Sequence, residues 1–243
     1  MNEGSITYGA QIQGLNLESI EIQGFQPSID KIVIKTENET RIIITFYIKD
    51  IFKQDDAILL THDYVALLIN RISFEFGSQI GEPRCEGWSL PKELNGNRHV
   101  VVRDFVVMYD LVGGTINPGT QRLQELKISL LKPISTLDRY LPLYRFAICQ
   151  SDPISRFLFL YNLILLLNGD KQVLVDNQII SIDNSVPLTP IPHKPNKTET
   201  LFTRLRNEVA HTRPNANQEL TAKEIINNVS RFQDLVKKAL DTI

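Results

Sequence analysis

The hydrophobic and polar positions of the first half of the chain mostly follow short, strand-like runs. Three runs are rich in Ile, Val, Thr and aromatic residues and are separated by turn residues, at 18–23, 31–36 and 41–48. Two further runs, 99–109 and 123–131, predict another pair of strands, because turn residues at 113–114 and 117–119 break the chain between them.

One amphipathic helix interrupts this strand pattern. Apolar residues recur there at i, i+3, i+4, i+7 and i+11, namely Val65, Leu68, Ile69, Ile72 and Phe76. This spacing predicts a helix with one apolar face, which Gly77 ends. The stretch 80–91, which contains the only Trp, is interpreted as a structured loop. The first half is therefore predicted to be α+β or mainly β.

After Lys132-Pro133 the pattern becomes helical. Asp152-Pro153 predicts a helix start, because Asp can cap free amides and Pro loses no hydrogen bond at the first helical position. The run 157–167 is apolar on nearly every face, so neighbouring helices must cover it all round. Asn168-Gly169 ends this helix.

Two more helices are predicted around a proline-rich segment. Residues 186–197 contain four prolines and predict a semi-rigid loop. A helix is expected from Thr198, and Arg213-Pro214 should end it. The spacing of Thr221 and Glu224 is that of a capping box, which predicts the start of a last helix. A core-facing stripe follows at Ile225, Val229, Phe232, Val236 and Leu240.

These patterns predict an α+β protein of two domains that meet near residue 135. Residues 1–135 form a β-rich α+β domain, and residues 136–243 form an all-α helical bundle. The net charge of −2 provides no global field for a polyanion, so any nucleic acid must bind a local patch. The first part has 13 basic and 17 acidic residues and the second 13 and 11, which favours the second for phosphate binding.

Composition and known motifs argue against several other classes of protein. Cys85 and Cys149 lie far apart, so we expect two reduced thiols rather than a disulfide. Residues 1–5 lack the basic start of a secretory signal, and the apolar run 154–167 is too short to span a bilayer. We therefore expect a cytoplasmic protein. The four histidines show no short metal-ligand spacing, and no nucleotide-binding or nucleophile-elbow motif occurs, so no metal or cofactor is predicted.

The string Leu-Arg-Asn-Glu-Val-Ala-His at 205–211 resembles the Arg-x4–6-His signature of HEPN domains. The apolar helix upstream and the capped helix downstream also suit that all-helical fold. The chain as a whole resembles the methylamine-utilisation MauJ-like family, at residues 73–77, 80–85, 152–157 and 204–208. The first domain then belongs to the same family, and we expect it to sense, to regulate or to bind a protein partner.

The resemblance implies metal-independent cleavage of RNA. The RNA's own 2′-hydroxyl would attack the adjacent phosphorus and leave a 2′,3′-cyclic phosphate and a free 5′-hydroxyl. His211 would act as general base or acid, and Arg206 would hold the phosphate and stabilise developing negative charge. Asn207 would orient the phosphate or its neighbour. RNA is the predicted substrate, because DNA lacks the 2′-hydroxyl.

Two further expectations concern the surroundings of this motif. Arg213 stands where some HEPN toxins have a modified Tyr, and it could extend a basic rim with Arg204, Lys194 and Lys197; scattered surface charge is the alternative. Residues five apart on an ideal helix diverge by about 140°. The Arg and His of the motif therefore converge only if the last turn unwinds or if two copies share a composite site, and we expect a homodimer. Glu208 is expected either in solvent or beside Arg206.

Two functions are compatible with this resemblance. The first is an endoribonuclease that acts in stress, as a toxin, or in defence against phage. The alternative is a non-catalytic HEPN-type module that only dimerises or docks a partner. An Arg and a His near a helix end often serve the helix itself, by capping carbonyls or by interacting with its dipole.

Overall fold

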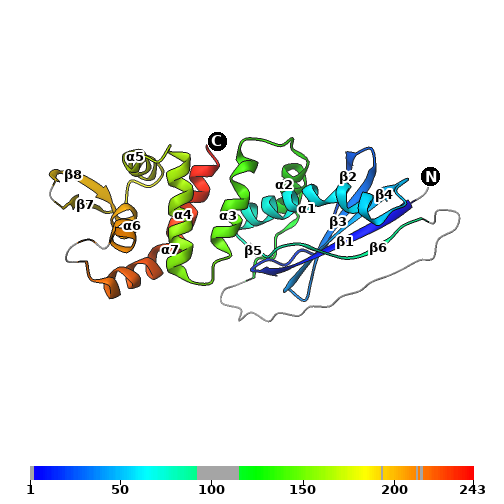
Figure 1. Ribbon diagram of the computed structural model, residues 1–243, viewed down its shortest axis with the longest axis horizontal. Helices are drawn as coiled ribbons and strands as arrows, with labels where there is room; N and C mark the ends of the chain where they lie inside the picture. Colours follow the sequence, from blue (N-terminus) through cyan, green and yellow to red (C-terminus); the bar gives the residue numbers. More distant parts are fainter. Residues whose placement is uncertain (1–2, 92–114, 193, 212, 214–215) are drawn as a thin grey trace. The chain divides into compact units, whose positions relative to one another are not determined.

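The structure is a computed structural model that describes the chain except for residues 1–2, 92–114, 193, 212 and 214–215 (Figure 1). Contacts divide it into two compact units, Met1–Ile134 and Ser135–Ile243, here called the first and the second unit. The division lies one residue from the boundary predicted from the sequence. The chain combines an antiparallel sheet with helices, which confirms the α+β class. The strand predicted at 99–109 lies outside the described residues.

The first unit is built on a six-stranded antiparallel sheet. Its strand order is β2 (Ile20–Gln26), β3 (Ile29–Glu37), β4 (Arg41–Lys49), β1 (Glu3–Gln13) and β5 (Gln79–Ile80), and β6 (Arg84–Ser89) also pairs with β1. The predictions of β2, β3 and β4 are confirmed to within a few residues. The structured loop predicted over 80–91 was wrong, because most of β6 and the end of β5 lie there and pair with β1.

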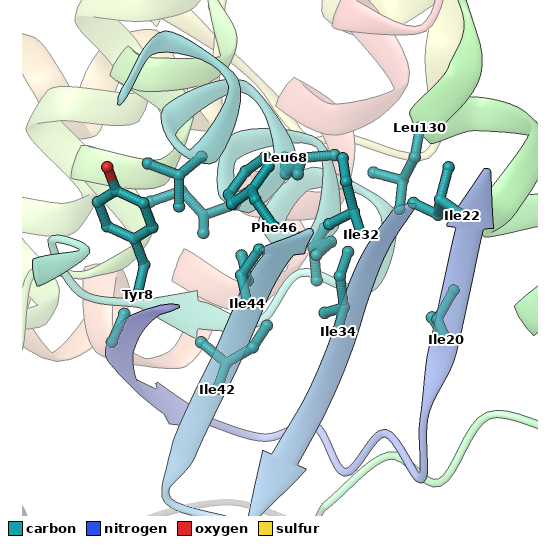
Figure 2. Packing of buried hydrophobic residues seen from close by; sticks show 14 of the residues in the cluster. Tyr8, Ile20, Ile22, Ile32, Ile34, Ile42, Ile44, Phe46, Leu68 and Leu130 are labelled. Carbon is teal, nitrogen blue, oxygen red and sulfur yellow. The ribbon is translucent and has the colours of Figure 1, made fainter. Parts of the chain in front are cut away.

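Helix α1 (Gln54–Phe76) packs its apolar face on this sheet. The five residues of the predicted stripe are all buried, which confirms the helix. Figure 2 shows Phe46 and Ile32 of neighbouring strands on the side of the sheet that carries Leu68 of α1. Gly77 ends the helix at a φ of 66°, where a side chain would be strained. Among the described helices α1 is apolar and long enough to cross a membrane, a test that buried core helices also pass.

The strand predicted at 123–131 was wrong, because the segment is helix α2 (Thr120–Leu131). Leu123, Leu126 and Leu130 share one face only at a helical period, and the last two are fully buried in the core of the unit. The carbonyl groups at the end of α2 are bound by the buried guanidinium of Arg71. It donates to the carbonyl oxygens of Ser129, Leu130, Lys132 and Pro133.

The second unit consists of helices and one small hairpin. Its helices are α3 (Leu141–Ile148), α4 (Pro153–Leu167), α5 (Gln172–Ile182), α6 (Leu201–His211) and α7 (Gln218–Leu240), and a short 3-10 helix spans Leu137–Arg139. Strands β7 (Leu188–Ile191) and β8 (Lys194–Thr200) pair antiparallel. The unit is therefore not all-α, and the prediction of a proline-rich loop was wrong. A two-stranded sheet has only edge strands, and edge strands tolerate prolines.

The ends of α4 were predicted correctly. Asp152 accepts a hydrogen bond from the backbone N of Ser155 at 2.7 Å, and Pro153 is the first helical residue. Asn168 is the C-terminal cap, and Gly169 follows with a φ of 60°. This helix packs along α7, so that Phe157 and Tyr161 lie against Phe232.

The start of α7 was not predicted correctly. The helix begins at Gln218, and the side chain of Asn217 accepts hydrogen bonds from the backbone N of Glu219 and of Leu220. The Thr221 hydroxyl is bound to Glu208 instead of capping the helix. The predicted core-facing stripe is confirmed, since all five of its residues are buried.

Candidate functional site

Helix α6 carries the residues that the sequence predicts to be catalytic. It begins at Leu201 rather than at Thr198, because residues up to Thr200 belong to β8. Phe202 and Leu205 are fully buried and attach the helix to the core of the second unit. His211 is the last residue of α6, and its side chain lies outside the part of the chain that the structure describes.

Asn207 of α6 is buried, with 6% of its surface exposed, and its side chain contacts α5 and β8. Its Oδ1 accepts hydrogen bonds from Gln172 Nε2 at 2.8 Å and from an Arg206 guanidinium nitrogen at 3.1 Å. Its Nδ2 donates to Glu199 Oε2 at 3.1 Å. The side chain thus binds three neighbours, and one of these is the predicted phosphate-binding arginine.

Arg206 is also held by an aromatic ring. Its guanidinium carbon lies 5.7 Å from the centre of the Tyr161 ring, within the range of a cation–π contact. The Tyr161 hydroxyl lies 2.9 Å from Thr203 Oγ1 and shares a hydrogen bond with it. Burial raises the pKa of the Tyr161 phenol to about 12, although the contact with Thr203 acts in the opposite direction. The ring is therefore neutral at physiological pH.

Glu199 is the most deeply buried carboxylate of this region, with 2% of its surface exposed. Arg213 donates to both of its oxygens, to Oε2 at 2.8 Å. These hydrogen bonds raise the pKa of the Arg213 guanidinium, although partial burial opposes the shift. A carboxylate removed from water is costly unless a cation compensates it, and Arg213 supplies that charge.

Arg204 is engaged on the other side of α6. It binds both carboxylate oxygens of Glu208, at 2.9 and 3.0 Å, and also the carboxylate of Glu224. The Thr221 hydroxyl donates to Glu208 at 2.7 Å. The expectation that Glu208 lies in solvent or beside Arg206 was therefore wrong, because its carboxylate is largely buried against Arg204.

The four residues of the predicted basic rim differ in their surroundings. Arg204 and Arg213 form ion pairs inside the second unit. Lys194 and Lys197 are exposed on β8. The cluster of Arg206, Asn207, Glu199 and Arg213, here called the arginine cluster, is what the structure brings together around α6.

Three residues that contact Arg206 or Asn207 were not recognised as candidate site residues in the sequence. Glu199 follows the proline-rich stretch, Tyr161 lies inside an apolar run, and Gln172 begins a helix that was not predicted. No motif joins these positions, since each contact depends on the packing of α4, α5 and β8 around α6. Among the residues with described positions, no group of three or more His, Cys, Asp or Glu could hold a metal ion.

No model of a known protein family, no curated protein and no solved structure matches the chain. The likeness to HEPN domains and to the MauJ-like family stays a prediction made from the residues.

Proposed function

We propose that the second unit is a metal-independent endoribonuclease of the HEPN type, centred on Arg206 and His211. One observation carries the proposal, namely the buried side chain of Asn207 that binds both Arg206 and Glu199. Glu199 in turn binds Arg213. Two arginines that flank His211 in the sequence are therefore held by a single hydrogen-bonded cluster.

The arginine cluster suits a phosphate at the surface of α6. A guanidinium offers a planar fork of donors that matches phosphate oxygens, and fixing it beforehand lowers the entropy lost on binding. Arg206 is half-buried and is held between the Tyr161 ring and Asn207. It would bind the scissile phosphate and stabilise charge on its oxygens. Asn207 would act as a positioning residue, since its side chain is occupied by protein groups.

His211 would move the protons of the reaction. An imidazole takes the proton of the RNA 2′-hydroxyl while the 2′-oxygen forms its bond to phosphorus. The bond from phosphorus to the 5′-oxygen breaks, and this oxygen receives a proton. The products are a 2′,3′-cyclic phosphate and a 5′-hydroxyl, and the step needs no metal.

The helical geometry of α6 points to two copies in the active form. The helix includes both positions, and positions 206 and 211 of a continuous helix are about 140° apart around its axis. One copy would supply the arginine and the other the histidine of each site. The proposal therefore includes a homodimer, with the first unit as a sensing, regulatory or partner-binding part.

The test is incubation of the full chain with total cellular RNA in the presence of EDTA. We expect cleavage by the wild type and its loss in Arg206→Ala and in His211→Ala. Arg139→Ala is the matched control, because this arginine is exposed in the short 3-10 helix before α3 and should leave cleavage unchanged. Equal cleavage by the wild type and both α6 variants would overturn the proposal.

A second candidate is a module that only dimerises or docks a partner. The observation in its favour is an exposed aromatic pair, Phe146 of α3 and Phe159 of α4, whose ring centres are 4.9 Å apart. Such apolar surface often marks an interaction site. Expression in cells separates the two functions: a ribonuclease should restrict growth, with relief by His211→Ala, and a docking module should not.

A further inference from the structure

A cavity of about 310 Å³ lies in the second unit, where α5 faces the β7–β8 hairpin and the start of α6. One wall is apolar and comes from α5 and β7, with Val173, Ile180, Leu188 and Ile191. Two buried carboxylates also line the cavity, Asp176 of α5 and Glu199 of β8. The proposed nuclease chemistry leaves this cavity and Asp176 without a role.

Asp176 has one carboxylate oxygen that accepts no hydrogen bond from the described residues. Its Oδ1 accepts three hydrogen bonds, from the Thr200 backbone N at 3.1 Å, the Thr200 hydroxyl at 2.7 Å and the Thr203 hydroxyl at 2.6 Å. No group of the described residues donates to its Oδ2, although the residue is only 9% exposed. Oδ2 is not among the buried side-chain atoms that lack a partner, so it is accessible, and Asp176 lines the cavity. A ligand in the cavity could donate a hydrogen bond to this anionic oxygen.

The other charged residues of the cavity do not fill this role. Both oxygens of Glu199 are bound by Arg213, and Oε2 also accepts from Asn207. Lys197 lines the cavity, but the ion pairs of the described residues include none between it and Asp176. The vacant acceptor is therefore a single oxygen. Calcium and magnesium require several oxygen ligands, so a cation that forms one directional hydrogen bond fits better.

We propose that this cavity binds a small aliphatic cation. Its ammonium or guanidinium group would donate to Asp176 Oδ2, and its carbon chain would lie against Val173, Ile180 and Leu188. A charged donor matches the buried carboxylate, and the apolar wall removes the carbon chain from water. This binding site does not depend on cleavage of RNA by α6.

Calorimetric titration of the full chain tests the proposal with three probes of similar length. Putrescine carries ammonium groups, agmatine carries one ammonium and one guanidinium group, and 1,4-butanediol is the neutral control. We expect at least one of the two cations to bind and the diol not to bind. The variant Asp176→Asn should weaken binding about tenfold or more, since it removes the charge and keeps Oδ1. Asp170→Asn removes one charge outside the cavity and should bind as the wild type does.

A second variant covers the case in which Asp176→Asn fails to fold. Ile180→Trp leaves the carboxylate in place but fills the cavity, and we expect it to abolish binding of the cation. Circular dichroism would first establish that each variant is folded. Two results would overturn the proposal: cations that bind no better than the diol, or unchanged affinity in a folded Ile180→Trp or Asp176→Asn protein.

Discussion

Arg213 donates hydrogen bonds to both carboxylate oxygens of Glu199, and Glu199 is 2% exposed. The pair joins the segment that follows α6 to the strand that precedes it. The ion pair therefore connects the residues just after α6 with the residues just before it. We regard this ion pair as the main structural support of the arginine cluster.

Removal of Arg213 should destabilise the second unit. In Arg213→Ala the Glu199 carboxylate stays buried without its cation, and loss of one partner from such a pair costs on the order of 3 kcal/mol. Urea denaturation followed by circular dichroism measures the difference in unfolding free energy.

The double variant Glu199→Gln with Arg213→Ala is the control for that experiment. The amide removes the buried charge, so we expect the double variant to recover part of the stability lost in Arg213→Ala. A double-mutant cycle gives the coupling between the two side chains. Additive losses would mean that the ion pair contributes nothing to the fold.

Arg71 should be equally important in the first unit. Its guanidinium binds four backbone carbonyl oxygens at the end of α2, at 2.8 to 3.2 Å. In Arg71→Lys a single ammonium cannot reach all of them, and we expect a loss on the order of 2 kcal/mol in unfolding free energy. Arg84→Lys, at an exposed position of β6, is the matched control and should unfold like the wild type. Equal stability of both variants would contradict this role.

The elements that the sequence predicted well have strong local signals. The stripe from Val65 to Phe76 ends at Gly77, and Asp152-Pro153 combines a capping acid with a proline at the first helical position. The error at 123–131 arose because the strand and helix periods compete there. The segment that forms α2 contains enough Leu and Ile to resemble a strand, and its burial at Leu126 and Leu130 follows the helical period instead.

The pH dependence of stability should contain a contribution from Asp183. Hydrogen bonds from the Ser185 side chain and from Arg231 lower its pKa from 3.8 to about 2. A carboxyl whose pKa is lowered by folding stabilises the fold above its unfolded pKa, and this contribution is lost as pH falls. We expect thermal unfolding of the wild type to shift more between pH 5 and pH 2 than that of Asp183→Asn, as calorimetry would measure. Identical shifts in the two proteins would disprove the contribution.

The candidate site could be predicted only in part. The motif residues Arg206 and Asn207 lie next to each other on α6, as their positions in the sequence require. Their partners Glu199, Gln172 and Tyr161 come from three other elements, and only the tertiary fold brings them together. The sequence also could not show that Arg204 and Arg213 are ion-paired, because a surface arginine and a buried one have the same local pattern.

Mixing of two inactive variants tests whether the site is shared between copies. Purified Arg206→Ala and His211→Ala proteins are combined and allowed to exchange subunits. After random exchange half of all dimers are mixed, and each mixed dimer of a composite homodimer contains one intact site out of two. We therefore expect recovery of about a quarter of the wild-type cleavage rate. No recovery after verified exchange would place both residues of each site in one copy.

The ends left on the RNA test the central claim most directly. A synthetic RNA is incubated with the full chain in EDTA, and the products are weighed by mass spectrometry. The account predicts fragments that end in a 2′,3′-cyclic phosphate and begin with a 5′-hydroxyl, and none from an otherwise identical DNA. RNA that stays intact, or fragments with a 5′-phosphate, would contradict the assignment of this chemistry to Arg206 and His211.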